Sequence, residues 1–457
     1  MKKSFQKLAI RSQSDLMFGR ASGSVVCGYG LELGTGKVYP ELNFTLPMMV
    51  LDRANWPAVL AQYEDIAAGI GRAARRLSLP GLMLEFELLP PMTEHPSWGA
   101  EITTLLHKQL KQLHDDIGLP CALRVTPTDI RDVTRPPELR SGAPLEALMH
   151  SFEECAAAGA DILSIESVGA KEVHDEALLY GDLEGILFAL GVLAPRDMEF
   201  LWTRIVDVCT SQKVVAGGDS ACGFANTAMQ LSSQGMLPEV LAAVVRAASA
   251  VRSLVAYECG AVGPSKDCAY EGPILKAITG TPISMEGKSA SCAHFSPVGN
   301  VAAAMCDLWS NESVQNVRLL SGPAPEAYLE LLAYDCRLFN EALRTGKEQL
   351  YQDLLVSSDV YLSPQAYVLS PRSTERIAAA LVKESSHYAM TLAAARESAS
   401  LLHEAAQKKE LTLNAREQEW LDKMIRELKA LPADEQSLME PMKERYGHLF
   451  SPESYGL

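Results

Sequence analysis

Three predicted strand ends in this chain carry side chains that can bind a metal. Glu166 ends an apolar run, Cys222 follows paired glycines together with Asp219, and Cys268 lies in a Gly-Pro loop. In a parallel α/β barrel, groups at the carboxyl ends of different strands face a common opening. One carboxylate and two thiolates would hold a zinc ion and leave its fourth position for a substrate. The sequence therefore raises a catalytic zinc site as one hypothesis.

The spacing of Glu166, Cys222 and Cys268 in the sequence also allows interpretations other than a metal site. The chain contains no short CxxC or HxxxH metal motif, so spacing alone favours buried structural thiols and a paired carboxylate. Cys259 lies close to Cys268, but a disulfide is not expected in a cytoplasmic protein. His294, two residues after Cys292, is expected to be a core or loop histidine rather than a ligand.

Short apolar segments alternate with amphipathic stretches, which is the pattern of repeated βα units. The amphipathic stretches include 99–118, 144–160 and 237–252. The predicted strands are 81–89, 121–127, 161–167, 213–220, 253–260, 282–288 and 317–322.

The alternation predicts an α/β fold of the (β/α)8 TIM-barrel type, with the position of the eighth strand unassigned. An open doubly wound sheet is the rival, weakened because no Gly-rich phosphate loop follows the first strand. We expect an N-terminal extension over 1–80, with a turn-rich segment at 28–47, a catalytic barrel over 81–373, and added helices over 374–457. With no flexible linker between them, these parts are expected to form one integrated domain.

The net charge and the lengths of the apolar runs argue against a nucleic-acid-binding protein and against a membrane-spanning one. A net charge of −16 argues against a nucleic-acid partner, because nucleic-acid-binding proteins normally present a basic face. No apolar stretch follows the lysines of the N-terminus, and the run 186–194 is too short to span a bilayer. We therefore expect a cytoplasmic protein without a membrane partner.

Nine segments and the residues PESYGL (452–457), in order over about nine-tenths of the chain, resemble the zinc-bearing subunit family of methanol:corrinoid-protein methyltransferases. The first forty residues match more loosely, which leaves the methyl donor open. The segments are ELNFTLP (41–47), PSWGAEI (96–102), GADILSIESVGAKEV (159–173), GDSACGFANTAM (218–229), RSLVAYECGAVGPSKDCAYE (252–271), KAITGTPISMEGKSASCAH (276–294), DLWSNESV (307–314), LAYDC (332–336) and SPQAYVL (363–369).

The resemblance implies an α/β barrel whose zinc is held by one glutamate and two cysteines. Carried over by motif, these are Glu166 of "SIES", Cys222 of "GDSAC" and Cys268 of "PSKDC". They are the residues that the strand-end argument selects. Cys259 falls where the family is expected to have alanine, so we expect it to be a bystander.

The resemblance also implies a zinc-dependent methyltransferase that moves the methyl group of methanol to the cobalt(I) of a separate corrinoid protein. The chain contains no Asp-x-His-x-x-Gly corrinoid motif of its own. Asp219 and Asp267 are predicted to handle the proton, on the ground of adjacency to the cysteines alone. A homodimer within a larger complex is expected.

Three alternatives remain at this stage. An O-demethylase would take the methyl group from an aryl or other methyl ether. A uroporphyrinogen-decarboxylase-like barrel would need no zinc, and a storage or scaffold protein would bind zinc without turnover.

Overall fold

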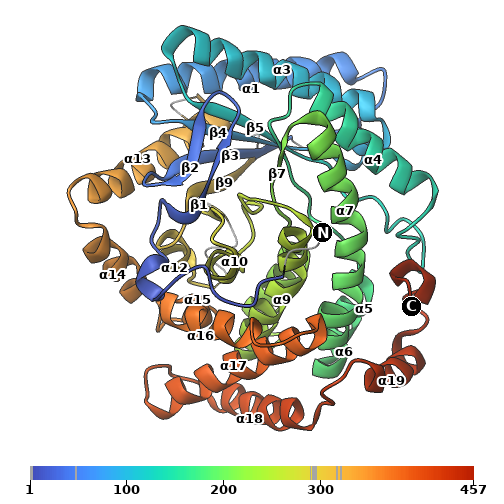
Figure 1. Cartoon of the computed structure of the whole chain (residues 1–457). Helices are drawn as coiled ribbons and strands as arrows, with labels where there is room; N and C mark the ends of the chain where they lie inside the picture. Colours follow the sequence, from blue (N-terminus) through green and yellow to red (C-terminus); the bar gives the residue numbers. More distant parts are fainter. Residues whose placement is uncertain (1–3, 47–48, 289, 291–295, 315–317, 320–321) are drawn as a thin grey trace.

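The computed structural model describes the chain except for residues 1–3, 47–48, 289, 291–295, 315–317 and 320–321. Its centre is a curled seven-stranded sheet with the order β7-β6-β5-β4-β3-β9-β8 (Figure 1). All pairings in this sheet are parallel, so the carboxyl ends of its strands share one edge. The strands are β3 (Tyr39–Thr45), β4 (Leu82–Glu87), β5 (Cys121–Thr126), β6 (Ile162–Leu163), β7 (Val215–Ala216), β8 (Ser284–Glu286) and β9 (Leu308–Val314).

The segment 261–266 contacts both edge strands of this sheet. On one side the amide of Val262 donates to the carbonyl of Ala216 in β7, at 2.9 Å. On the other side the amide of Ser284 in β8 donates to Ser265 Oγ, at 3.2 Å. The segment therefore runs between β7 and β8 without regular strand geometry.

A β-hairpin covers the amino ends of the strands. Strands β1 (Arg20–Cys27) and β2 (Leu31–Thr35) pair antiparallel. Leu31 and Leu33 of this hairpin are fully buried in a cluster with residues near the starts of the sheet strands, such as Tyr39 and Met83. The hairpin therefore closes this end of the sheet, and the loops that follow the strands lie at the opposite, carboxyl edge.

Five of the predicted strands are confirmed: 81–89, 121–127, 161–167, 213–220 and 282–288 contain β4, β5, β6, β7 and β8. The prediction missed β9 and also β3, which lies in the segment expected to precede the barrel. Both neighbours of β3 are strands of the main sheet, so residues before 81 belong to it.

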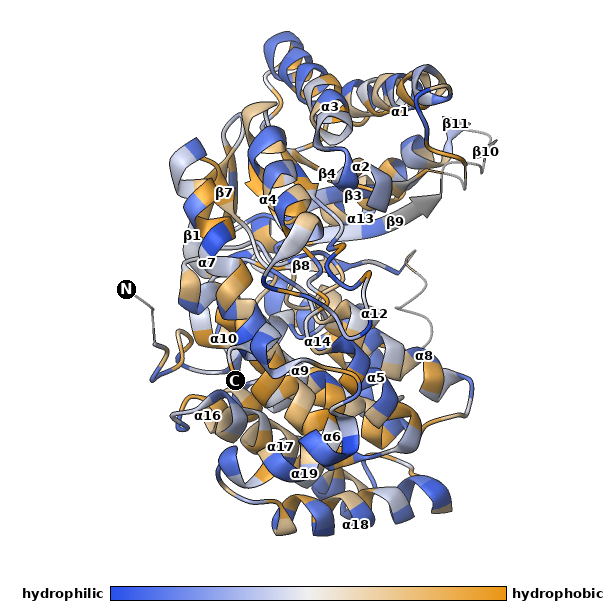
Figure 2. Cartoon of the chain, turned by 90° about the vertical axis from the view of Figure 1, so that its right-hand side faces the viewer, coloured by the Kyte–Doolittle hydropathy of each residue, from blue (hydrophilic) through white to orange (hydrophobic). Residues whose placement is uncertain are grey.

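The strand predicted at 253–260 is wrong, because these residues form the last turns of helix α9 (Glu239–Cys259) and the residue that ends it. Every residue of α9 from Val240 to Glu258 is buried, so its apolar residues show no one-sided periodicity. A continuous apolar run cannot be assigned to helix or strand by periodicity. By length and composition α9 could cross a membrane, but its most apolar stretch is wholly buried inside the protein. The residues of α9 are mostly coloured hydrophobic in Figure 2.

The strand predicted at 317–322 is also not part of the main sheet. Of its described residues, β10 (Arg318–Leu319) pairs antiparallel with β11 (Gly322–Pro323) in a separate two-stranded sheet.

Helices surround the sheet, and α16 to α18 add a further layer beyond α9 (Figure 1). The predicted amphipathic stretches overlap most of α3, most of α4 and about two thirds of α9. The described helices other than α9 are α1 (Trp56–Leu77), α2 (Pro90–Glu94), α3 (Pro96–Ile117), α4 (Gly142–Ala157), α5 (Lys171–Tyr180), α6 (Leu183–Phe188), α7 (Ala194–Gln212), α8 (Thr227–Ser233), α10 (Gly272–Thr279), α12 (Gly299–Ala303), α13 (Ala324–Arg344), α14 (Glu348–Asp359), α15 (Pro364–Leu369), α16 (Pro371–Leu381), α17 (His387–Gln407), α18 (Ala415–Ala430) and α19 (Gln436–Tyr446). Short 3-10 or π turns lie at η1 (Gln13–Asp15), η2 (Ala189–Leu193), η3 (Cys222–Asn226) and η4 (Pro452–Tyr455).

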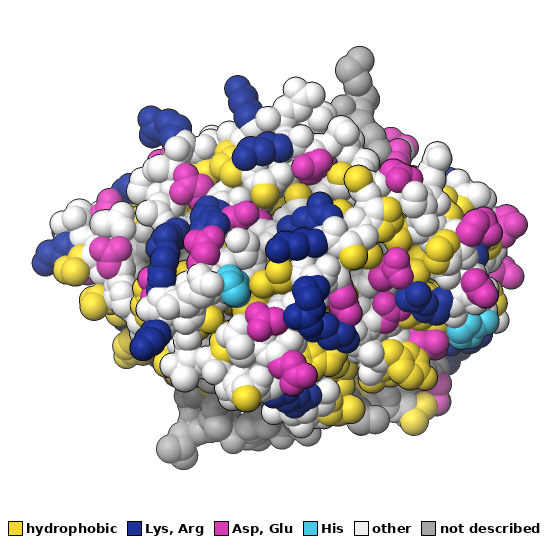
Figure 3. Space-filling view, turned by 90° about the horizontal axis from the view of Figure 1, so that it is seen from below, with side chains coloured by type: hydrophobic (Ala, Val, Ile, Leu, Met, Phe, Trp, Pro, Cys, Tyr) yellow, Lys and Arg dark blue, Asp and Glu magenta, His cyan; other side chains and the backbone are white. Residues whose placement is uncertain are grey.

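Charges of both signs are mixed on the face seen from below Figure 1. Figure 3 shows lysines and arginines interspersed with aspartates and glutamates over the described part of this face. Such a mixed surface differs from the continuous basic stripe of a nucleic-acid-binding face.

Candidate metal centre

The structure brings Glu166, Cys222 and Cys268 together. One carboxylate oxygen and the two sulfur atoms lie within 4.8 Å of one another. Cys268 Sγ donates a hydrogen bond to Glu166 Oε1 at 2.6 Å. The three side chains thus form one cluster of possible metal ligands.

Each of the three residues comes from a different connection at the carboxyl edge. Glu166 follows β6, and Cys222 begins the π turn η3 that follows β7. Cys268 follows the segment 261–266 between β7 and β8, and not a strand at 253–260. The cluster therefore lies over the end of the sheet that the β1–β2 hairpin leaves uncovered.

Burial favours the protonated forms of these groups in the absence of a cation. The pKa of Cys268 is raised well above its ordinary value, first by burial and then by the neighbouring Cys222 thiol. A hydrogen bond with Cys268 lowers the pKa of Cys222, but burial and the charge of Glu166 outweigh it and bring that pKa to about 11. Burial also raises the pKa of Glu166. A bound cation would have to displace these protons, as thiol ligands of metals require.

A buried lysine next to the cluster was not predicted. Lys266 Nζ lies 3.1 Å from Glu85 Oε1 and 2.5 Å from Glu87 Oε1, and it also bonds Asp267. Its distance to Glu166 Oε1 is 3.7 Å. Although Glu85, Glu87 and Asp267 lie close enough to hold a metal, the cation among them is the lysine.

A sequence signal for this lysine cluster existed. Glu85 and Glu87 alternate along β4, so both side chains project from one face of that strand. Two carboxylates on a buried strand need a cation. The adjacent Lys266 of "PSKDC" supplies it.

Asp219 and Asp267, the predicted proton carriers, are both buried and held by several donors. Asp219 accepts hydrogen bonds from Trp202 Nε1 at 2.8 Å and from the amides of Ser167 and Ser220. It therefore joins the loop of Glu166 to the loop of Cys222.

Asp267 faces the lysine cluster and not the thiols. It accepts from Asn43 Nδ2 at 3.1 Å, from Ser310 Oγ at 2.9 Å and from Lys266. Burial alone would raise the pKa of Asp267, but the positive charge of Lys266 lowers it overall.

Cys259 lies away from the cluster. Its sulfur is 3.9 Å from Thr203 Oγ1 and 3.9 Å from the carbonyl of Glu199, at the end of α9. Cys259 and Cys268 are both free thiols, so the expected absence of a disulfide between them agrees with the structure. Cys292 and His294 lie outside the described residues.

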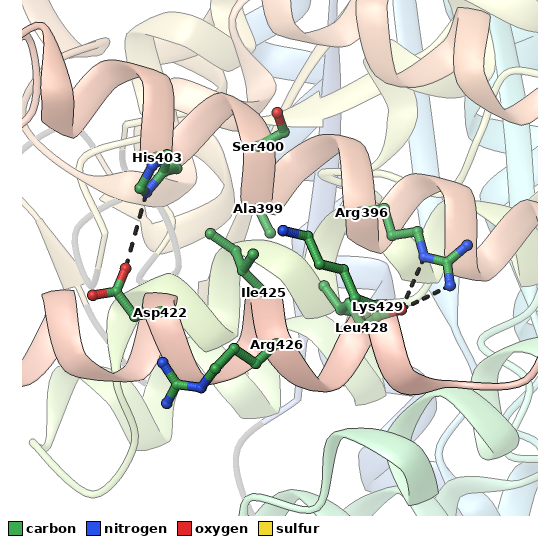
Figure 4. Close-up of a pocket in the computed structure, with 9 residues that line it drawn as sticks. All are labelled: Arg396, Ala399, Ser400, His403, Asp422, Ile425, Arg426, Leu428 and Lys429. Atoms are coloured by element: carbon green, nitrogen blue, oxygen red, sulfur yellow. Dashed lines mark hydrogen bonds and ion pairs between the residues drawn. The ribbon is translucent and has the colours of Figure 1, made fainter.

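A cavity of about 540 Å³ lies elsewhere, between α17 and α18 (Figure 4). Arg396 spans it by donating to the carbonyl of Leu428, and His403 faces Asp422. Its lining residues come from these two helices alone, so it is separate from the thiol cluster.

Comparisons with known proteins agree with this geometry. The methanol–corrinoid protein co-methyltransferase of Methanosarcina barkeri (strain Fusaro / DSM 804) is 38% identical over 461 residues, covering 99% of each chain. A crystal structure of the methanol:cobalamin methyltransferase complex MtaBC from Methanosarcina barkeri contains a chain that matches with a TM-score of 0.95 and 38% identity, over 100% of both chains. The model of the methanol-cobalamin methyltransferase B subunit family matches residues 2–456. The chain therefore belongs to the methanol-cobalamin methyltransferase B subunit family.

Proposed function

We propose that this chain transfers the methyl group of methanol to the cobalt(I) of a partner corrinoid protein, using one zinc ion held by Glu166, Cys222 and Cys268. The observation that carries the proposal is the meeting of one carboxylate and two thiols within 4.8 Å in a member of this family. The relative's name supports methanol rather than a methyl ether as the donor. The MtaBC complex supports a separate corrinoid-bearing partner.

The donor set fits zinc. Bonds of about 2.3 Å to sulfur and about 2.1 Å to oxygen place tetrahedral ligand atoms roughly 3.5–4 Å apart. The three candidate atoms already lie within a slightly larger limit, so small side-chain shifts suffice. Three protein ligands also leave one position for the substrate.

In the proposed reaction the methyl–oxygen bond of methanol breaks, the methyl group joins cobalt, and the oxygen leaves as water after gaining a proton. Zinc, when bound, supplies Lewis acidity toward the substrate oxygen. Glu166, Cys222 and Cys268 hold the ion, and Lys266 balances part of the negative charge of the ligands. Asp219 orients the two loops that carry Glu166 and Cys222.

The proton-handling roles of Asp219 and Asp267 remain predictions. Their contacts favour a positioning role for Asp219, whose oxygens accept from Trp202 and two backbone amides. Asp267 pairs with Lys266, whose Nζ lies 3.7 Å from Glu166 Oε1, which supports Asp267 as the proton carrier of the two.

We also propose that the segment 261–266 takes the place of the eighth strand and closes the sheet into a barrel. Its hydrogen bonds to β7 and β8 support this. The predicted parts 1–80, 81–373 and 374–457 then form one domain, which the central place of β3 and the packing of α17 on α9 support. A cytoplasmic location is supported by the nine described cysteines, all free.

Methyl transfer to a reduced corrinoid protein tests the proposed function. With zinc-loaded protein, methanol should methylate cobalt(I), whereas methoxybenzenes should react at least about tenfold more slowly. The visible spectrum of the corrinoid measures the rate. Methylation from methoxybenzene but not from methanol would support the O-demethylase alternative, and protein that purifies and works without metal would contradict the zinc site.

A homodimer is part of the proposal, and an exposed apolar stripe on α13 and α14 supports it. Leu331, Tyr334 and Leu338 lie three and four residues apart on α13, so they share one helix face. Leu350 and Leu354 lie on α14, which packs against α13, and all five side chains are at least half exposed. Exposed large apolar side chains on neighbouring helices support an interface with another chain.

The position of the stripe favours a second copy of this chain as its partner. Asp335, next to Tyr334, accepts from Trp309 Nε1 near the start of β9, and Asn340 bonds Val38 just before β3. The stripe thus lies toward the amino ends of the strands. A corrinoid protein must reach the opposite end, where the thiols lie.

Size-exclusion chromatography with light scattering, which measures the molar mass of the eluting protein, tests this interface. The wild type is expected to elute as a dimer, and the double variant Leu331→Glu, Leu338→Glu as a monomer with unchanged zinc content. A monomeric wild type, or a double variant that stays dimeric, would show that the stripe is not the interface.

A further inference from the structure

Each of the two thiols has its own side-chain hydrogen-bond donor. Asn226 Nδ2 lies 3.1 Å from Cys222 Sγ. Ser220 Oγ lies 3.2 Å from Cys268 Sγ. Both donors belong to the segment 218–229 that follows β7, and both are almost fully buried.

Arg246 fixes which end of the Asn226 amide faces the sulfur. Its Nη2 lies 3.2 Å from Asn226 Oδ1 and 3.0 Å from Gln365 Oε1. An arginine only donates hydrogen bonds, so the Asn226 oxygen must face Arg246. The amide nitrogen is thereby left to donate to Cys222 Sγ.

A backbone amide orients Ser220 in the same way. The amide of Cys222 donates to Ser220 Oγ at 3.0 Å, so this oxygen already acts as an acceptor. The single hydroxyl proton is then free to point at Cys268 Sγ. Cys268 donates its own proton to Glu166, which leaves its sulfur lone pairs as the acceptor.

We infer that Asn226 and Ser220 are positioning residues that limit how much negative charge the two thiolates donate to the metal. The inference rests on the proposed function and goes beyond it. Two thiolates and one carboxylate carry more negative charge than a divalent ion neutralises. A hydrogen bond to a thiolate withdraws electron density from sulfur, and donors around a metal's ligands tune its properties. With these two bonds, a metal held by Glu166, Cys222 and Cys268 would polarise the substrate oxygen more strongly than the same ligands would allow without the two donors.

Cobalt(II) substitution tests the inference through a spectroscopic signal. The probe is Co²⁺ alone, added to the metal-free full-length protein, and the readout is the thiolate-to-cobalt charge-transfer band. In Asn226→Leu and in Ser220→Ala, the loss of a donor raises the energy of the sulfur electrons. The band should therefore move to longer wavelength at full cobalt occupancy. Methyl transfer by the zinc forms should fall by about tenfold or more.

Three further variants separate this effect from a structural one. Asn226→Asp keeps an oxygen toward Arg246 but removes the N–H donor, so it should shift the band even if Asn226→Leu folds poorly. Ser220→Thr keeps the hydroxyl and should restore the wild-type band. Thr227→Val is the matched control, because Thr227 Oγ1 donates to the carbonyl of Gly223 and not to a sulfur, and it should leave the band unchanged.

The outcomes distinguish failure of the metal site from failure of the two hydrogen-bond donors. A wild-type protein that binds Co²⁺ without a thiolate band would contradict the proposed metal site itself. A normal wild-type band that stays at the same wavelength in Asn226→Leu, Asn226→Asp and Ser220→Ala would overturn only the role of the two donors.

Discussion

Replacing Cys268 with alanine is expected to remove bound zinc and methyl transfer together. Two ligands would remain, Glu166 and Cys222, and zinc in proteins is held by at least three protein ligands. Zinc content, measured by elemental analysis, should fall from about one ion per chain to near zero. Methylation of cobalt(I) should become undetectable in the same preparation.

Cys259→Ala is the matched control for this prediction. Cys259 is nine positions earlier in the same motif, but its sulfur contacts Thr203 and Glu199 on α7. The variant should keep both zinc and activity. We expect Cys268→Ala to fold, because removing one small buried side chain leaves most of the core in place. Circular dichroism checks this. If Cys268→Ala kept its zinc, the assignment of this residue as a ligand would be wrong.

Replacing Lys266 with methionine is expected to destabilise the protein by about 3–5 kcal/mol. The lysine is almost fully buried and is the cation nearest Glu85, Glu87 and Asp267 in the cluster that they form. Methionine has a similar length but no charge, so the buried Glu85 and Asp267 and the partly exposed Glu87 would lose the positive charge of the lysine. Urea denaturation of the metal-free protein at neutral pH measures the loss of unfolding free energy.

An exposed lysine provides the comparison. Lys288 pairs with Asp335 at 2.9 Å, but its side chain is 65% exposed. Lys288→Met should therefore cost no more than about 1 kcal/mol. The double variant Lys266→Met, Glu85→Gln should recover part of the loss, because it removes one buried negative charge. Equal stability of the two lysine variants would show that the buried cluster does not depend on Lys266.

Sequence reasoning found the three possible ligands although it misplaced one of their elements. Glu166, Cys222 and Cys268 can meet as long as the elements that they follow end at the same edge of the sheet. The segment 261–266 meets this requirement between β7 and β8, even though 253–260 is helical. An irregular segment has no periodicity of its own, so no pattern could have identified it.

The missing strands have a different cause. In the sheet, β3 lies between β4 and β9, and β9 is distant from β3 in the sequence. Pairing between remote segments leaves no local signal, and the nearby hairpin β1–β2 made the whole region look like an extension. The contacts of Ser220 and Asn226 were equally hidden, because they depend on side-chain geometry within the turn after β7.

The placement of β3 has a consequence for synthesis on the ribosome. Tyr39 of β3 pairs with Leu308 of β9, so one edge of β3 stays unpaired until the ribosome has made most of the chain. Meanwhile β3 can pair with β4, which emerges soon after it, and leave an unpaired edge exposed. Open strand edges recruit other chains. A chain released before residue 308 would therefore expose the unpaired edge of β3. We expect nascent chains to aggregate at this edge unless translation is completed or a chaperone binds them.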